Sequence, residues 1–325
     1  MNSAWQGRRE GGGWFALWLI RCIGLRGGRP PARLLLYPIT LYFFLRRGPE
    51  RRASRAYLAR VLGRPARTRD VLRHFHAFAA TTLDRVFLLA RGERGLRFEV
   101  SGLDALLDAL APGRGALLVG AHLGSFEALR ALAGRAPQIP LRLVLDRQQT
   151  PALNVLLEAL APALRAQVID AAQGATAVML GMGEAARGGA LLAMLGDRAR
   201  ATEPTVPAPL LGAPAHFPAA PWRVAAALGV PVLLGFGIYL GRDRYHLHFE
   251  AFAPRIDLPR TAGARAPVLA ALAARYAARI EAQLHAHPYN WFNFYDFWAA
   301  PADDPYLRTA ADAACRHAGA GGTGT

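Results

Sequence analysis

The amino-acid sequence predicts an α/β fold in which a mainly parallel sheet is sandwiched by helices, with an N-terminal membrane-associated helical segment before it. Two observations carry this prediction. From about residue 96 onward, short apolar runs alternate with longer amphipathic runs, which is the order of strands and crossover helices in a parallel sheet. The run "GALLVGAH" (115–122) is apolar almost throughout, as expected of a strand covered on both faces. A chain of 325 residues, 53% of them hydrophobic, can bury such a core.

The N-terminus contains two apolar blocks, "WFALWLIRCIGL" (14–25) and "LLLYPITLYFFL" (34–45). Each is shorter than the ~20 residues that span a bilayer comfortably, and Arg21 and Pro38 interrupt them. Their flanks are rich in Arg, and Trp and Tyr lie in or near them, which is typical of a lipid interface. We therefore expect an interfacial or hairpin membrane anchor, with two buried core helices as the alternative. A single spanning helix ranks lower, because it would bring several arginines toward the hydrocarbon.

Helices are expected between residues 51 and 92. The stretch "SRAYLARVLG" (54–63) is amphipathic, and apolar residues recur at helical spacing in "RDVLRHFHAFAATTLDRVFLLARG" (69–92). His74 and His76 are two residues apart, so they cannot share a helix face. We interpret them as solvated or core histidines and not as a site.

Strands and helices alternate through the rest of the chain. Ser125 is expected to cap the helix after the strand 115–122, Gly134 to end it, and Pro151 to open the next helix. The Pro-rich stretch before residue 219 is expected to be a loop, and 244–252 alternates as an edge strand would. The expected strands are 96–102, 115–122, 141–146, 166–170, 189–197, 230–240 and 244–252. The expected helices are 103–112, 124–134, 150–162, 175–188, 219–229 and 266–288.

These elements divide the chain into four parts. A membrane-anchoring or interfacial segment (1–50) is followed by a helical region (51–95), an α/β domain (96–301) and a flexible tail (302–325). The tail ends in "HAGAGGTGT", a composition typical of disorder.

The charge and the cysteines exclude some functions. The formal net charge is +16, and all 39 basic residues are arginines. Such a surface attracts phosphates, anionic lipid headgroups or acidic proteins without choosing among them. Nucleic acid is disfavoured as a partner, because the arginines are scattered and no zinc-finger, RRM or KH signature occurs. Cys22 and Cys315 lie near opposite ends and outside any C-x-x-C pair, which argues against a disulfide framework or a Cys-based zinc site.

His122 and Glu127 are the first candidates for chemistry. His122 follows an apolar strand, at the edge where open α/β sheets place their sites, and Glu127 falls in the first turn of the next helix. Across this corner Glu127 can fold back onto a ring nitrogen, and a carboxylate there would fix the tautomer that a general base requires. The alternative is a polar corner in which Glu127 is only a favourable charge at a helix start. The sequence alone leaves the two readings about even.

Two other chemistries fail at the same corner. A serine hydrolase needs G-x-S-x-G, but Ser125 lies in "HLGSFE" and is better explained as a helix cap. A zincin needs H-E-x-x-H, and no second histidine is near.

Later strand ends supply further polar residues. Arg147 follows one strand in "LDRQQTP", and Asp197 and Arg198 follow another in "GDR". Asp197 and Arg198 side by side would suit a phosphate-bearing substrate, although a local ion pair that shapes the loop is an equal alternative. His216 and Phe217 are candidates for lining a substrate groove, with core or loop packing favoured.

The motif H-x4-E at a strand–helix corner, followed by the Arg and the Pro-led helix of "LVLDRQQTPALNVLLE" (143–158) and by "GDR" with its Pro-rich stretch, resembles the lysophospholipid acyltransferase superfamily. The sequence is similar to a divergent member of the bacterial lipid A biosynthesis (lauroyl/myristoyl) acyltransferase branch over roughly 14–300. Its "HPYNWFNFYDFW" (287–298) is similar to the branch's terminal "HPEQWFWxHRRW". Asn293 to Asp296 replace the His-Arg-Arg part, and Ala220 stands where a Gly is usual, so lipid A itself is not implied as the acceptor.

The resemblance implies a membrane-associated acyltransferase without a cofactor or metal. It would move a fatty acyl group from an acyl carrier protein or coenzyme A thioester to a hydroxyl of a lipid or glycolipid. The implied place is the bacterial inner membrane, with the acyltransferase domain facing the cytoplasm. His122 would be the general base and Glu127 its partner, while Arg147, Asp197 and Arg198 would bind substrate or stabilise the oxyanion. The alternative is a non-catalytic lipid-binding or scaffold protein with the same fold, against which the intact His122–Glu127 pair speaks.

Overall fold

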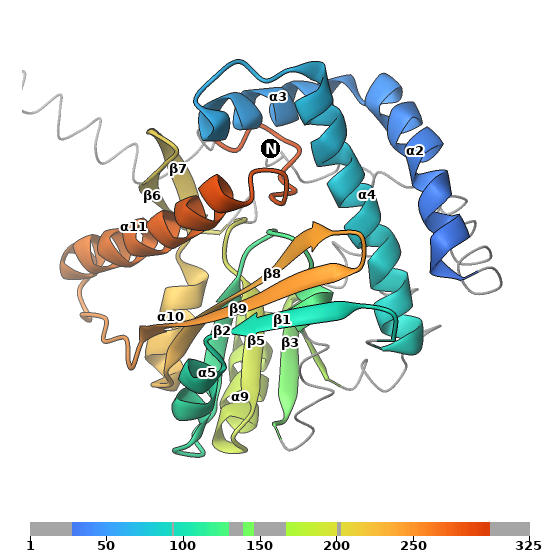
Figure 1. The fold of residues 1–325 in the computed structure, drawn as a ribbon. Helices are drawn as coiled ribbons and strands as arrows, with labels where there is room; N and C mark the ends of the chain where they lie inside the picture. The colour runs from blue at the N-terminus through green and yellow to red at the C-terminus, as the bar shows by residue number, and fades with distance from the viewer. Residues whose placement is uncertain (1–27, 93, 130–138, 146–166, 200–202, 300–325) are drawn as a thin grey trace, which may run out of the picture.

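The computed structural model describes residues 28–92, 94–129, 139–145, 167–199 and 203–299. The main-sheet strands in this part of the chain are β1 (Arg97–Ser101), β2 (Ala116–Gly120), β3 (Leu141–Leu145), β4 (Val168–Asp170), β5 (Leu191–Leu195), β8 (Val232–Gly241) and β9 (Arg244–Ala253). They form one sheet in the order β1-β9-β8-β2-β5-β3-β4 (Figure 1). Neighbouring strands are parallel except β8 and β9, which are antiparallel. The predicted α/β fold with a mainly parallel sheet is confirmed.

The helices follow the predicted order. Their bounds are α2 (Arg29–Arg46), α3 (Gly48–Leu62), α4 (Thr68–Arg91), α5 (Leu103–Leu110), α9 (Ala175–Arg187), α10 (Ala220–Leu228) and α11 (Ala262–Ala286). Of the expected helix 124–134, residues 126–129 are helical and the remainder lies beyond the described part, as does all of the expected helix 150–162.

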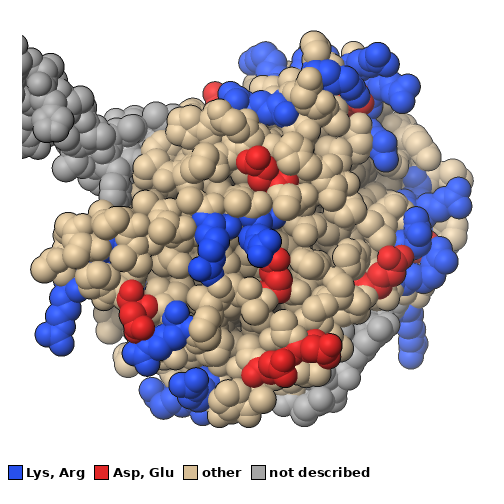
Figure 2. Space-filling model, turned by 60° about the vertical axis from the view of Figure 1, so that its left-hand side comes forward, with Lys and Arg blue, Asp and Glu red and all other residues tan. Residues whose placement is uncertain are grey.

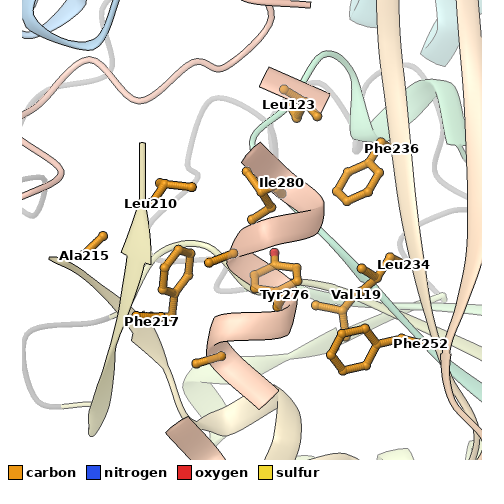
Figure 3. Close-up of a cluster of buried hydrophobic side chains, with 14 of the residues drawn as sticks. Val119, Leu123, Leu210, Ala215, Phe217, Leu234, Phe236, Phe252, Tyr276 and Ile280 are labelled. Atoms are coloured by element: carbon orange, nitrogen blue, oxygen red, sulfur yellow. The ribbon is translucent and has the colours of Figure 1, made fainter. Parts of the chain in front are cut away.

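Helices cover both faces of the sheet, as the strand β2 illustrates. Its Leu117 and Val119 enter a hydrophobic core that also contains residues of α3, α9, α10 and α11. Its Ala116 and Leu118 enter a second core, which contains residues of α2, α4 and α5. Figure 3 shows the first core, where Tyr276 of α11 lies among Val119 and the side chains around it. The apolar run 115–122 is therefore buried on both faces, as its composition predicts.

Two sequence expectations about strands are wrong. The alternation of residues 244–252 predicts an edge strand, but β9 pairs with β1 on one side and β8 on the other. Alternation reports that one face of a strand is polar, and here the polar face is half-buried around His246 and His248. It carries no information on whether both edges are paired.

The expected Pro-rich loop contains a hairpin of β6 (Thr205–Leu210) and β7 (Ala213–Pro218). Pro207 and Pro209 lie on the exposed face of β6, while Val206 and Ala208 are buried. A two-stranded sheet leaves one edge of each strand unpaired, and Pro is tolerated where no N–H is needed for the ladder.

Helix α2 packs along α4 and presents an apolar face outward. Its buried residues recur every fourth position, from Ala32 to Phe44. The exposed apolar side chains of the helix are Leu34, Tyr37, Leu41, Tyr42 and Leu45. Within the described part of the chain, no helix combines the length and the apolar character that a bilayer span needs. The block 14–25 lies outside the described residues, so the membrane-associated N-terminal segment stays a prediction.

Candidate active site

The site lies at the carboxyl ends of β2 and β5. These strands are adjacent and parallel, and Gly120 at the end of β2 is in register with Leu195 at the end of β5. His122 follows β2 by two residues and Asp197 follows β5 by two residues. The register of the two strands therefore places these side chains together, at the sheet edge where α/β folds bind their ligands.

His122 and Asp197 form two hydrogen bonds. The His122 Nδ1–H donates to Oδ1 of Asp197 at 2.7 Å, and the backbone N–H of His122 donates to Oδ2 at 3.0 Å. The Asp197 side chain is fully buried, whereas 28% of the His122 side chain is exposed. Because an ionised carboxylate only accepts, Nδ1 carries the proton, and Nε2 is left as an acceptor.

A segment from the far end of the chain completes this pair. Trp291 Nε1 donates to Oδ2 of Asp197 at 3.2 Å, and Asn293 Nδ2 donates to the same oxygen at 3.1 Å. This segment belongs to "HPYNWFNFYDFW" (287–298), in which the sequence predicted no site residue. One signal was available in "WFNFYDFW": an Asn flanked by aromatic residues has to satisfy its amide if the run is buried.

Arg198 is turned toward the same segment. Its Nε donates to Oδ1 of Asn293 at 2.5 Å, and its Nη2 donates to the carbonyl oxygen of Phe292 at 2.8 Å. The guanidinium also lies 5.7 Å from the ring centre of Tyr295. The described hydrogen bonds thus link Arg198 to Asp197 through Asn293, and not as the direct ion pair that the sequence left as one alternative.

The backbone of the corner is fixed by glycine. Gly124 has a φ of 69°, and a Cβ there would come within 2.0 Å of the Gly237 carbonyl oxygen in β8. Its N–H donates to the carbonyl of Asn290, and the Ser125 N–H donates to that of Gly237. Ser125 Oγ then accepts from the N–H of Ala128, which confirms the predicted helix cap.

Glu127 does not occupy the expected place on a ring nitrogen of His122. Its carboxylate Oε1 lies 2.9 Å from Nε of Arg85 in α4, and its Oε2 accepts from Ser125 Oγ at 3.4 Å. Because the helix starts at Phe126, Glu127 lies in its first turn, where it pairs with α4. The carboxylate on the imidazole is that of Asp197, which the sequence had assigned to substrate binding.

Burial and two arginines set the charge state of the pair. Burial lowers the pKa of His122 below its ordinary value, and the positive charges of Arg198 and Arg85 lower it further, against the opposing effect of Asp197. Burial alone would raise the pKa of Asp197, but the adjacent His122 and Arg198 hold it well below its ordinary value. At neutral pH a neutral imidazole therefore faces an ionised carboxylate, which is the state that a general base requires.

The other residues that the sequence singled out are not part of the described site. Arg147 lies outside the described residues. Phe217 is buried in the core drawn in Figure 3, and His216 is half-buried on the other face of β7. His74 is a core histidine bonded to Ser54 and to the carbonyl of Trp291. No group of His, Cys, Asp and Glu among the described residues is arranged to hold a metal ion.

Similarity to one protein family extends over most of the chain. A family model described as bacterial lipid A biosynthesis acyltransferase matches residues 10–299. Among curated proteins, none matches the chain. The family match spans most of the chain and includes the strand ends that carry His122 and Asp197. The chain therefore belongs to the bacterial lipid A biosynthesis acyltransferase family.

Proposed function

We propose that this chain transfers a fatty acyl group from an acyl thioester to a hydroxyl of a lipid or glycolipid, with His122 as the general base. The observation that carries the proposal is the 2.7 Å hydrogen bond between buried Asp197 and the partly exposed ring of His122. This bond leaves Nε2 as the acceptor on the accessible part of the ring. Family membership supports acyl transfer on lipid as the reaction.

The reaction proceeds in two steps through His122. Nε2 takes the proton of the acceptor hydroxyl as its oxygen attacks the thioester carbonyl, and Asp197 stabilises the imidazolium that forms. The tetrahedral intermediate then collapses, the C–S bond breaks, and the thiolate takes the proton from Nε2. The products are an ester and a free thiol, and no covalent acyl-enzyme is needed.

Arginines supply the positive charge that the donor and the oxyanion need. Arg85 and Arg198 both lie close enough to depress the pKa of His122. Of the arginines that the sequence named, Arg147 and Arg198 remain our candidates for substrate contact. Both donor classes, acyl carrier protein and coenzyme A, carry phosphates that such cations attract.

An exposed aromatic side chain lies close to His122. Phe78 of α4 is 40% exposed and contacts Phe292 edge-on with ring centres 5.3 Å apart. The backbone N–H of Phe292 donates to the His122 carbonyl, so this exposed ring lies near the general base. An apolar margin of this kind supports a lipid acceptor over a soluble one.

We further propose that the protein works at the inner membrane with this domain facing the cytoplasm. The outward face of α2 is apolar, and Arg46 and Arg47 lie at its C-terminal end. Figure 2 shows further basic side chains gathered along the top of the molecule, at the level of α3 in Figure 1. Apolar contact together with positive charge is what an anionic leaflet selects.

The proposed function is tested by acyl transfer in vitro. The full-length protein is given acyl-coenzyme A or acyl-carrier-protein thioester together with a bacterial lipid extract, and acylated products are identified by mass spectrometry. His122→Ala should lower the rate by about 10²–10⁴-fold, the contribution of general base catalysis. His285→Ala is the matched control, because it removes an exposed histidine on α11. An unchanged rate in His122→Ala would refute the assignment.

A further inference from the structure

The segment from Asn290 to Asn293 runs beside the corner that carries His122. Gly124 N–H donates to the Asn290 carbonyl at 2.8 Å, and Phe292 N–H donates to the His122 carbonyl at 2.9 Å. Leu123 and Trp291 form an antiparallel bridge between these two bonds. The far end of the chain is therefore bonded along the backbone of the candidate base.

Asp197 Oδ2 accepts from three described donors, and this segment supplies two of them. Oδ1 faces Nδ1 of His122, while Oδ2 accepts from the His122 backbone, Trp291 and Asn293. A carboxylate without exposure stays ionised only if such donors replace water. With Oδ2 held by three donors, Oδ1 is left to the imidazole in one orientation.

We propose that Trp291 and Asn293 are positioning residues of the acyl transfer, which hold Asp197 ionised and aimed at His122. The inference rests on the proposed function, since it names further residues of the same site. Neither side chain has a described contact with the imidazole, so both would act on the reaction through Asp197.

Arg198 fixes the orientation that Asn293 needs. Its Nε–H donates to the amide oxygen of Asn293, which identifies that atom as the acceptor and turns the NH₂ group toward Asp197. Asn and not Asp is required here, because a second carboxylate would accept from Arg198 but could not donate to Asp197.

The pH profile separates positioning from mere support of the fold. The charged or titratable groups that act on His122 and Asp197 are Arg198 after β5, Arg85 of α4, Tyr276 of α11 and Tyr295, which follows the segment. Trp291→Phe leaves all four in place, and an apolar residue at 293 removes one acceptor of Arg198 without adding a charge. Loss of a donor to Oδ2 favours the protonated form of the coupled pair, so the acid limb of the kcat/KM profile must move to higher pH.

The test compares Trp291→Phe and Asn293→Leu, which each remove a donor without adding a charge, with two controls from the stretch 290–298. Trp298→Phe removes an indole N–H that donates to the Leu210 carbonyl at 3.1 Å, away from Asp197. Asn290→Ala removes bonds to the backbone of Tyr239. In the first two variants we expect the midpoint of the acid limb to move to higher pH by about one unit or more. A shift of this size corresponds to the free energy of one lost hydrogen bond to a charged group. The controls should keep the wild-type midpoint, whatever stability they lose.

A spectroscopic readout keeps the inference apart from the proposed function. The His122 Nδ1–H proton is measured by NMR in the folded protein, with His122→Ala to assign it. Its resonance should shift in Trp291→Phe and Asn293→Leu and stay in place in Trp298→Phe. If the wild type transfers no acyl group but this pattern is found, the function fails and the positioning stands. The positioning role would be overturned if neither the resonance nor the acid limb moved in the two test variants. It would also be overturned if Trp298→Phe shifted them equally.

Discussion

At the scale of single residues, two carboxylates near His122 have different tasks. Asp197 bonds to the imidazole, and Glu127 pairs with Arg85, whose positive charge also acts on His122. We expect Glu127→Ala to lower turnover on the order of a hundredfold, because an unopposed guanidinium beside the ring weakens the base. The rate of acyl transfer at saturating donor measures this loss.

A double variant tells this role from a direct one. If Glu127 acts by holding Arg85, then adding Glu127→Ala to Arg85→Ala should cost little more than Arg85→Ala alone. If Glu127 instead contacts the imidazole during catalysis, the two losses will multiply. Unfolding curves of all three variants serve as the control for their folding.

His74 makes the stability of the protein depend on pH. Its ring is fully buried, its Nδ1 bonds to Ser54 Oγ at 2.8 Å and its Nε2 to the Trp291 carbonyl at 2.8 Å. Burial lowers its pKa from 6.5 to about 4. Between these two values the unfolded chain binds a proton that the folded chain refuses, so the free energy of unfolding falls as the pH drops.

The expected loss from His74 is about 3 kcal/mol between pH 6.5 and pH 4. Urea unfolding of the wild type and of His74→Gln at a series of pH values checks it. The wild type should lose stability more steeply than the variant in this window, and the two should run parallel above it. If the free energy of unfolding ran parallel in the two proteins at every pH, His74 would bind its proton equally well in the folded and the unfolded chain.

At the scale of elements, the turn between β2 and the next helix depends on close backbone approach. Gly124→Ala should destabilise the fold by about 2–3 kcal/mol, since the residue has a positive φ and the new Cβ would collide with the Gly237 carbonyl. Gly63→Ala is the matched control, with a φ of 61° and nothing within 4 Å of its Cβ. Thermal unfolding should give the larger loss for Gly124→Ala, and equal losses would contradict the close approach.

Local sequence patterns decided which strands and helices could be predicted. The strands and helices were predictable from local patterns, because β2 is a short continuous apolar run and α4 has apolar residues at helical spacing. The hairpin β6–β7 was missed because Pro normally excludes strands, and only an unpaired edge tolerates it. The edge assignment of β9 failed because alternation reports the faces of a strand and not its neighbours.

The partner of His122 could not be predicted locally. Both His122 and Asp197 were recognised at strand ends, but only the strand order makes β2 and β5 neighbours. Trp291 and Asn293 come from a third region, nearly a hundred residues farther along the chain. Such contacts depend on tertiary packing, and a corner motif read by itself favours the nearer carboxylate, Glu127.

At the scale of the whole molecule, α2 gives the protein one apolar side. The five outward side chains from Leu34 to Leu45 are between 50% and 70% exposed. The helix is held in this orientation from inside, because Arg29 donates two hydrogen bonds of 2.7 Å to buried Asp84. Arg33 adds a bond to the Tyr239 hydroxyl at 2.6 Å. A helix locked in this way presents its apolar face as a fixed surface.

We expect this surface to carry part of the membrane binding of the protein. Deleting residues 1–45 would also remove core residues of α2, so point variants are the sharper experiment. Leu41→Glu combined with Leu45→Glu should weaken binding to phosphatidylglycerol vesicles by about tenfold or more, because burial of each Leu is worth about 1.5–3 kcal/mol and a carboxylate is repelled by the anionic surface. Leu180→Glu on α9 is the matched control, since Leu180 is 69% exposed. Equal sedimentation of all three proteins with vesicles would mean that α2 does not face the bilayer.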